Sequence, residues 1–186
     1  IQIVDLDVPQ STIRFGRASF KRHDADYMTA VVITHILGGG TGLSSRLFRE
    51  VREKRGLAYS VDASLSTLDH AAFLHGGTST KNERARESLD VIRKEIIDLA
   101  NSGPTPDELE KGKKYLIGSY ALRFDTSAKI AGQLVHIQMD GFGPEWLVER
   151  NLRIEAVTMD DAQRVARRLF GDGGLSVAVV GRPVGL

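Results

Sequence analysis

The chain has 186 residues, a length typical of a single domain with its own hydrophobic core. Its 25 Lys and Arg residues nearly balance its 24 Asp and Glu residues, so the net charge of +1 gives no electrostatic reason to expect binding to nucleic acid or to an anionic membrane. Cysteine is absent, which excludes disulfides, thiolate metal sites and a cysteine nucleophile, and no apolar run approaches the roughly 20 residues of a membrane-spanning helix.

Two strands are expected at the start of the chain, over residues 1–8 and 11–20. Both stretches are rich in β-branched and aromatic residues, and Pro9 separates them. A helix is expected next, over residues 25–37. Two aspartates lie at its start, as is typical of helix caps, and a run of glycines follows its end.

A second helix is predicted over residues 44–55. Apolar residues recur there at every fourth position, and charged residues four positions apart can pair on the opposite face. Arg49 and Glu53 form one of these expected ion pairs. Gly56 follows as the residue that ends the helix.

A pair of strands is predicted to follow this helix. Leu57, Tyr59 and Val61 alternate with smaller residues, so we expect their three side chains to lie on one face of a strand. Residues 71–80 have the composition of a neighbouring strand, joined to the first by a turn over residues 67–70.

The second half of the chain is predicted to be mainly helical. Helices are expected over residues 82–100, from the capping box at 105–108 to residue 124, over residues 127–140, around residue 146 and after the capping box at 158–161, with a closing strand at 175–181. This order lacks the strict alternation of strands and helices that is typical of a doubly wound sheet. It favours an α+β fold of two layers, in which helices cover one face of a largely antiparallel sheet.

We expect residues 1–186 to form one domain. The sequence opens directly in strand-like residues, without an initiator Met or a leader, which indicates a piece of a longer chain.

The glycine-rich run at residues 38–42 does not match a phosphate-binding loop. A Walker A loop ends in Gly-Lys followed by Ser or Thr, and this ending is missing here. The dinucleotide-binding motif G-x-G-x-x-G would need its last glycine at position 43, which is a leucine. The run also follows a predicted helix instead of a strand. A helix end with a turn is the simpler interpretation, and a loop that touches substrate is the alternative.

Local sequence signals for a metal site or a nucleophilic serine are also missing. The five histidines have neither the H-E-x-x-H nor the H-x-x-E-H spacing, so no zinc site is predicted within this chain. No Gly-x-Ser-x-Gly sequence is present to predict a nucleophile.

Three segments carry a resemblance to a known family. They are Ile-Leu-Gly-Gly-Gly at residues 36–40, Ser-Arg-Leu-Phe at 45–48 and Val-Arg-Glu-Lys-Arg-Gly-Leu-Ala-Tyr-Ser-Val at 51–61, and weaker agreement extends over nearly the whole chain. With these segments the chain resembles the M16 zinc metallopeptidases, the family of pitrilysin, insulinase and the mitochondrial processing peptidase. The similarity is to the second, non-zinc-binding half of the shorter bacterial members, which implies a metallohydrolase half of the LuxS and processing-peptidase fold.

The resemblance implies roles for five residues. In the family's second half, an Arg and a Tyr seven positions apart contact the substrate backbone, and they match Arg52 and Tyr59. Both side chains can donate hydrogen bonds to a peptide carbonyl oxygen as it becomes an oxyanion. The glycine-rich loop of processing peptidases takes part in substrate handling, and it matches Gly38, Gly39 and Gly40.

The resemblance also implies a cofactor and partners. The family's first half binds the zinc, so the complete protein is expected to be a zinc endopeptidase, while this chain alone holds no metal and is inactive. Expected partners are a peptide substrate and the zinc-binding half, on the same polypeptide or on another subunit, and a homodimer is compatible with the family. The alternative is a binding or assembly subunit without catalysis, as in the respiratory-complex core proteins. The resemblance leaves the compartment open between a bacterial cytoplasm and a periplasm.

Overall fold

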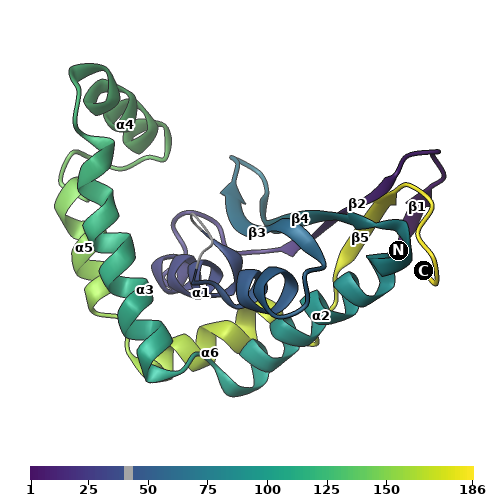
Figure 1. The fold of residues 1–186 in the computed structure, drawn as a ribbon. Coiled ribbons are helices and arrows are strands. Elements are labelled where there is room, and N and C mark those ends of the chain that lie inside the picture. Colours follow the sequence, from purple (N-terminus) through teal and green to yellow (C-terminus); the bar gives the residue numbers. More distant parts are fainter. Residues whose placement is uncertain (40–43) are drawn as a thin grey trace.

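A five-stranded sheet forms one layer of the protein (Figure 1). The computed structural model describes residues 1–39 and 44–186. The strands are β1 (Gln2–Val4), β2 (Gln10–Ala18), β3 (Ala58–Thr67), β4 (Ala72–Lys81) and β5 (Ser176–Val180), in the spatial order β1-β5-β2-β4-β3. All neighbouring pairs are antiparallel except β1 with β5. The predicted α+β fold with a largely antiparallel sheet is confirmed.

Only one face of the sheet is covered. On β2, Ile13 and Phe15 are buried, whereas Gln10 and Arg14 on the opposite face are exposed. This alternation is expected for an antiparallel sheet with helices on one side. The core therefore lies between the apolar face of the sheet and the helices.

The helices form the second layer and continue beyond it. They are α1 (Tyr27–Gly38), the π-helix η1 (Phe48–Glu53), the 3-10 helix η2 (Asn82–Arg84), α2 (Ala85–Ser102), α3 (Pro106–Gly118), the 3-10 helix η3 (Ser119–Arg123), α4 (Ser127–Met139), α5 (Trp146–Glu155) and α6 (Met159–Phe170). Helices α1 and α2 pack against the sheet, α6 packs on both of them, and α3 and α5 lead away from these helices to α4 (Figure 1). In the described part of the chain, no helix has the length and apolar character needed to cross a membrane.

Both predicted capping boxes are present. The Thr105 hydroxyl accepts a hydrogen bond from the Glu108 amide at 3.2 Å, and the Glu108 carboxylate accepts one from the Thr105 amide at 2.8 Å. Thr158 and Asp161 form the same arrangement at the start of α6. Each cap satisfies backbone donors that the helix leaves free and contributes about 1 kcal/mol.

The two aspartates expected to cap α1 have a different role. Asp26 occupies the N-cap position, but its side chain makes no capping hydrogen bond. Its carboxylate instead accepts hydrogen bonds from Arg164 and Arg168 of α6. Arg164 donates to both oxygens of this carboxylate, and such a bidentate pair between two charged groups is stronger than a single hydrogen bond from a backbone amide.

Candidate functional site

Arg52 lies in η1, a π-helix where an α-helix was predicted. The wider turn is visible in the hydrogen bond from the Lys54 amide to the carbonyl of Arg49, five residues earlier, at 2.9 Å. Gly56 ends the segment in a left-handed conformation with φ of +57°, and its amide donates to the Arg52 carbonyl at 2.9 Å. π-Helical turns are rare and are frequently found at functional sites.

The start of β3 contains a β-bulge. Ala58 pairs with Thr80 and Val61 pairs with Thr78, so β3 carries one residue more than β4 between these positions. Hydroxyls of β4 satisfy the carbonyls that the bulge displaces: Thr80 donates to Leu57, and Thr78 donates to Ser60, each at 2.7 Å. The bulge is therefore held by specific hydrogen bonds.

The bulge turns Tyr59 out of the core. Its side chain is 81% exposed, whereas Leu57 and Val61 are 5% and 4% exposed. The prediction that these three side chains share one face is wrong, because the extra residue breaks the two-residue alternation of the strand. Among the described residues, none forms a hydrogen bond with the Tyr59 hydroxyl, which is left to solvent or a ligand.

The structure brings Arg52 and Tyr59 together. The guanidinium carbon of Arg52 lies 4.5 Å from the centre of the Tyr59 ring and 4.9 Å from the centre of the Phe48 ring. Such cation–π contacts contribute about 0.5 to 1 kcal/mol at exposed sites. Stacking on a ring uses the face of the guanidinium and leaves the N–H donors along its edge free. Phe48 was not identified from the sequence, although its position one helical turn before Arg52 was a usable signal.

Arg52 differs from the other basic residues of its segment. Arg46 forms an ion pair with Glu108, with a nitrogen–oxygen distance of 2.7 Å. Lys54 and Arg55 form ion pairs with Glu50 at 2.7 and 2.6 Å. Arg52 makes no hydrogen bond or ion pair with any residue in the described ranges.

Arg49 is also paired, but not as predicted. It lies 3.6 Å from Glu50 and 3.7 Å from Glu108, in place of the expected pair with Glu53. The spacing of four residues assumed an α-helix, and the π-helix rotates the later residues out of that register. Arg52 is therefore the basic residue of this segment whose donors stay available.

Glu50 is the acidic centre of the same segment. Burial disfavours its charged form, but hydrogen bonds from Arg55 and Lys54 outweigh burial and lower its pKa to about 2. The carboxylate therefore stays ionised at neutral pH and is occupied by these two side chains.

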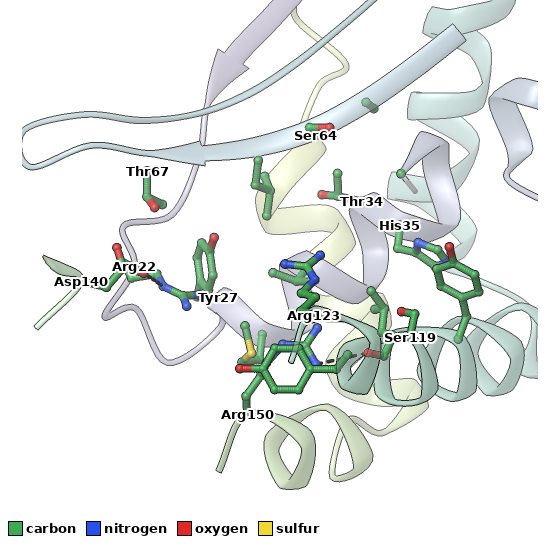
Figure 2. Close-up of a pocket in the computed structure, with 18 residues that line it drawn as sticks. Arg22, Tyr27, Thr34, His35, Ser64, Thr67, Ser119, Arg123, Asp140 and Arg150 are labelled. Atoms are coloured by element: carbon green, nitrogen blue, oxygen red, sulfur yellow. Dashed lines mark hydrogen bonds and ion pairs between the residues drawn. The ribbon is translucent and has the colours of Figure 1, made fainter. Parts of the chain in front are cut away.

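Gly38 and Gly39, the described glycines of the 38–42 run, differ in environment. Gly38 is buried, and a Cβ there would lie 2.9 Å from the Ala63 amide nitrogen, so the close approach of α1 to β3 requires glycine. The Gly39 amide donates to the carbonyls of Thr34 and His35, and Gly39 borders a cavity of about 590 Å³ beside α1 and β3 (Figure 2). Gly40 lies outside the described residues. Contact of Gly38 and Gly39 with substrate stays a prediction.

Residues 1–39 and 44–186 contain no group of three or more His, Asp or Glu side chains placed to hold a metal ion. Two of the histidines have other contacts: His35 stacks on Tyr115 at 4.8 Å, and His75 shares a hydrogen bond of 2.9 Å with Ser66. The described residues thus do not fit the zinc ion that the resemblance implies for the complete protein, and we assign no reaction step to zinc on this chain.

Comparison with known proteins identifies the family. The family model described as the peptidase M16 inactive domain matches residues 1–116. An uncharacterised zinc protease of Streptomyces coelicolor is 30% identical over 172 residues, which are 92% of this chain and 37% of that protein. A non-peptidase homologue of Helicobacter pylori is 36% identical over 127 residues, which are 67% of this chain and 29% of that protein.

A solved structure has the same fold. The peptidase M16 inactive domain from Pseudomonas fluorescens aligns with a TM-score of 0.90 at 24% identity, covering 98% of this chain and 43% of that chain. The chain spans less than half the length of each of these three proteins. The predicted family is confirmed: this chain belongs to the M16 peptidase family and corresponds to its inactive domain.

Proposed function

We propose that this chain is the substrate-binding half of a zinc-dependent M16 metalloendopeptidase, in which Arg52 and Tyr59 contact the carbonyl oxygen of the bound peptide. The observation that carries this proposal is that the guanidinium of Arg52 is held in place but, within the described ranges, unpaired. It is stacked against Tyr59 at 4.5 Å, and it alone among the basic residues of its segment has no carboxylate partner in the described structure.

The chemistry of the pair suits a peptide carbonyl. The guanidinium edge and the phenol hydroxyl are both donors, and both belong to side chains whose positions are set by the π-helix and the bulge. Donors held in place before the reaction stabilise negative charge on a carbonyl oxygen without having to reorganise. Arg52 and Tyr59 would bind and polarise the carbonyl, while the zinc site belongs to a part of the complete protein outside this chain.

The test is peptide turnover by the complete protein that carries this chain. We expect Arg52→Gln to lower kcat/KM by about 100-fold to 1000-fold, the usual effect of removing one oxyanion donor. Arg153→Gln is a control, because Arg153 also stacks on an aromatic ring, at 4.9 Å from the centre of Trp146, but lies on α5 and is paired with Glu149 at 3.1 Å. Equal turnover by the two variants would refute the role of Arg52.

A second function is favoured by one relative. The Helicobacter pylori protein that is 36% identical to this chain is described as a non-peptidase homologue. On that precedent, we consider a binding or assembly subunit as the alternative, in which the pair contacts a peptide without any cleavage. Peptide binding without turnover by the metal-loaded complete protein would favour this alternative.

A further inference from the structure

The cavity beside Gly39 has the size of a ligand site and an unusual set of charges. Its volume of about 590 Å³ lies within the range of typical ligand pockets. Residues of α1 and the segment before it, of β3, α3, η3 and α5, and of the loop after α4 line it, and Figure 2 shows their polar side chains around one opening. Three of the lining residues are arginines, namely Arg22, Arg123 and Arg150, against one carboxylate, Asp140.

Arg22 and Asp140 neutralise each other. The Arg22 Nε donates to the Asp140 carboxylate at 2.8 Å, and the guanidinium carbon of Arg22 also lies 4.7 Å from the centre of the Tyr27 ring. No other carboxylate lines the described part of the cavity. His35 adds no charge at neutral pH, because burial lowers its pKa. The two remaining arginines therefore give the cavity a net positive charge.

Arg150 is held in place without a counter-ion. It stacks on the Tyr120 ring at 4.1 Å, and its NH1 donates to the Leu116 carbonyl at 3.2 Å and to the Asn151 side chain at 2.7 Å. Burial lowers its pKa to about 10, and the nearby charge of Arg123 acts in the same direction. A partly buried guanidinium without a carboxylate is costly, and an anion that enters the cavity would relieve that cost.

Arg123 supplies a second free donor group. It lies in η3, is exposed, and forms no hydrogen bond or ion pair within the described ranges. In Figure 2 it points toward the same opening as Arg150. Two guanidinium groups on one side of a cavity match the geometry of a carboxylate, whose two oxygens accept paired hydrogen bonds.

One wall of the cavity favours a peptide over a small free anion. Ala63, Leu65 and Thr67 of β3 line it, and β3 is the last strand of the sheet. An edge strand leaves backbone donors and acceptors unpaired, and extended peptides bind such edges through main-chain hydrogen bonds.

We propose that this cavity binds a carboxylate of the peptide substrate through Arg123 and Arg150, so that the protein prefers peptides with an acidic side chain or a free C-terminus in this position. The peptide nature of the ligand rests on the function proposed above. The charge of the ligand rests only on the cavity itself.

The test is binding of labelled peptides to the complete protein, measured by fluorescence anisotropy. A neutral peptide with an amidated C-terminus is compared with two versions of it, one with a Gln→Glu change and one with a free C-terminal carboxylate. We expect at least one acidic version to bind roughly 10-fold more tightly, with a preference that shrinks at high salt. The version that gains affinity identifies the source of the carboxylate. Equal affinity of all three peptides would overturn the proposal.

Variants separate this cavity from the Arg52 site. Arg123→Gln should remove the preference for the acidic peptide, whereas Arg123→Lys should keep part of the preference. Arg86→Gln is the control, since it removes the same charge from an exposed position on α2. A preference that persists in Arg123→Gln contradicts the proposal even if Arg52→Gln abolishes turnover. A preference lost only in Arg123→Gln supports it even if the protein cleaves no peptide.

Discussion

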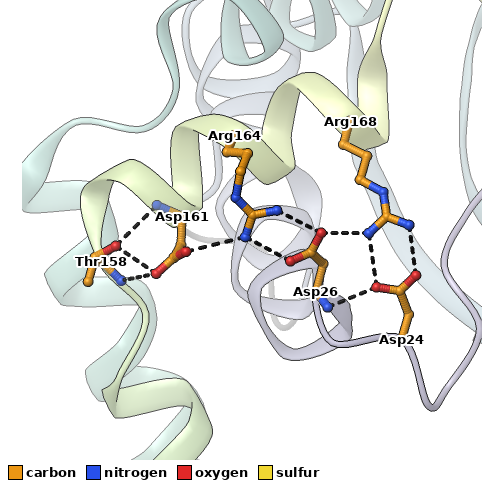
Figure 3. Close-up of polar contacts among 6 residues, drawn as sticks. All are labelled: Asp24, Asp26, Thr158, Asp161, Arg164 and Arg168. Carbon is orange, nitrogen blue, oxygen red and sulfur yellow. Dashed lines mark hydrogen bonds and ion pairs between the residues drawn. The ribbon is translucent and has the colours of Figure 1, made fainter.

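Two arginine-containing clusters of this protein differ in how completely their hydrogen-bonding groups are used. In the first, Arg164 and Arg168 of α6 bind Asp26 and Asp24 in the segment before α1 (Figure 3). In the second, the guanidinium of Arg52 stacks on two aromatic rings and forms no hydrogen bond or ion pair among the described residues. The paired arginines fasten two elements together, whereas the stacked arginine keeps its donors for something else.

The first cluster is a closed network. Arg164 binds both oxygens of Asp26 at 2.8 Å, and Arg168 bridges Asp26 at 2.5 Å and Asp24 at 2.8 Å. Asp161, which caps α6, also lies 3.3 Å from Arg164. Helix α6 is therefore fixed by its cap at the start and by ion pairs farther along it, and we expect this cluster to contribute to stability and not to activity.

Acid should have the largest effect on stability, because it protonates carboxylates both in η1 and in the closed network. The pKa of Glu50 is lowered to about 2, and hydrogen bonds from Arg168 and Arg164 lower the pKa values of Asp24 and Asp26. A lowered pKa stabilises the folded state above the unfolded pKa, near 4.5 for Glu50, and this stability is lost as the pH falls toward 2.

For Glu50 the loss should be on the order of 2 to 3 kcal/mol, measured by urea unfolding between pH 6 and pH 2.5. The variant Glu50→Gln should be less stable at pH 6 and should depend less on pH. The same slope in the variant and the parent protein would show that Glu50 does not carry the effect.

Removing the central carboxylate of the closed network should have the next largest effect. We expect Asp26→Ala to lower the free energy of unfolding by about 2 kcal/mol, because Asp26 is nearly buried and both arginines lose a partner. Both guanidinium groups are roughly half exposed, so water limits the loss. Asp5→Ala is the control, since Asp5 pairs with Arg182 at an exposed site and should cost less than about 0.5 kcal/mol.

Loosening the bulge should have a smaller effect on stability. Thr80→Val removes the hydroxyl that binds the Leu57 carbonyl and should cost about 1 kcal/mol. If the bulge orients Tyr59, the variant should also lower peptide turnover, although the Thr80 side chain itself is buried. Thr12→Val on the exposed face of β2 is the control. Full turnover with reduced stability would show that the bulge supports the fold but does not position Tyr59 for activity.

Arg52→Gln should change stability least. Arg52 makes two cation–π contacts at the surface, so we expect the free energy of unfolding, measured in urea, to change by no more than about 0.5 to 1 kcal/mol. A loss as large as that of Asp26→Ala would place Arg52 among the structural arginines and would remove the contrast between the two clusters.

Sequence reasoning succeeded where the signal is local. The capping boxes at Thr105 and Thr158 are short motifs that act within one helical turn, and both are formed. The strand-like composition of the first residues and the order of elements were enough to predict a largely antiparallel sheet with helices on one face.

It failed where the geometry depends on distant contacts. The bulge that exposes Tyr59 is defined by the pairing of β3 with Thr78 and Thr80 of β4, which no pattern within β3 reveals. Arg123 and Arg150 come from separate elements and meet only in the folded cavity. The family resemblance pointed to Arg52 and Tyr59, but their stacking required the π-helix and the bulge together.

The most direct test of the account is a double-mutant cycle of peptide turnover by the complete protein, with Arg52→Gln, Tyr59→Phe and the double variant. If the two side chains act on one carbonyl oxygen as a stacked unit, each single variant lowers kcat/KM and the double variant loses less than the product of the two single losses. Losses that multiply independently, or single variants with full turnover, would contradict it.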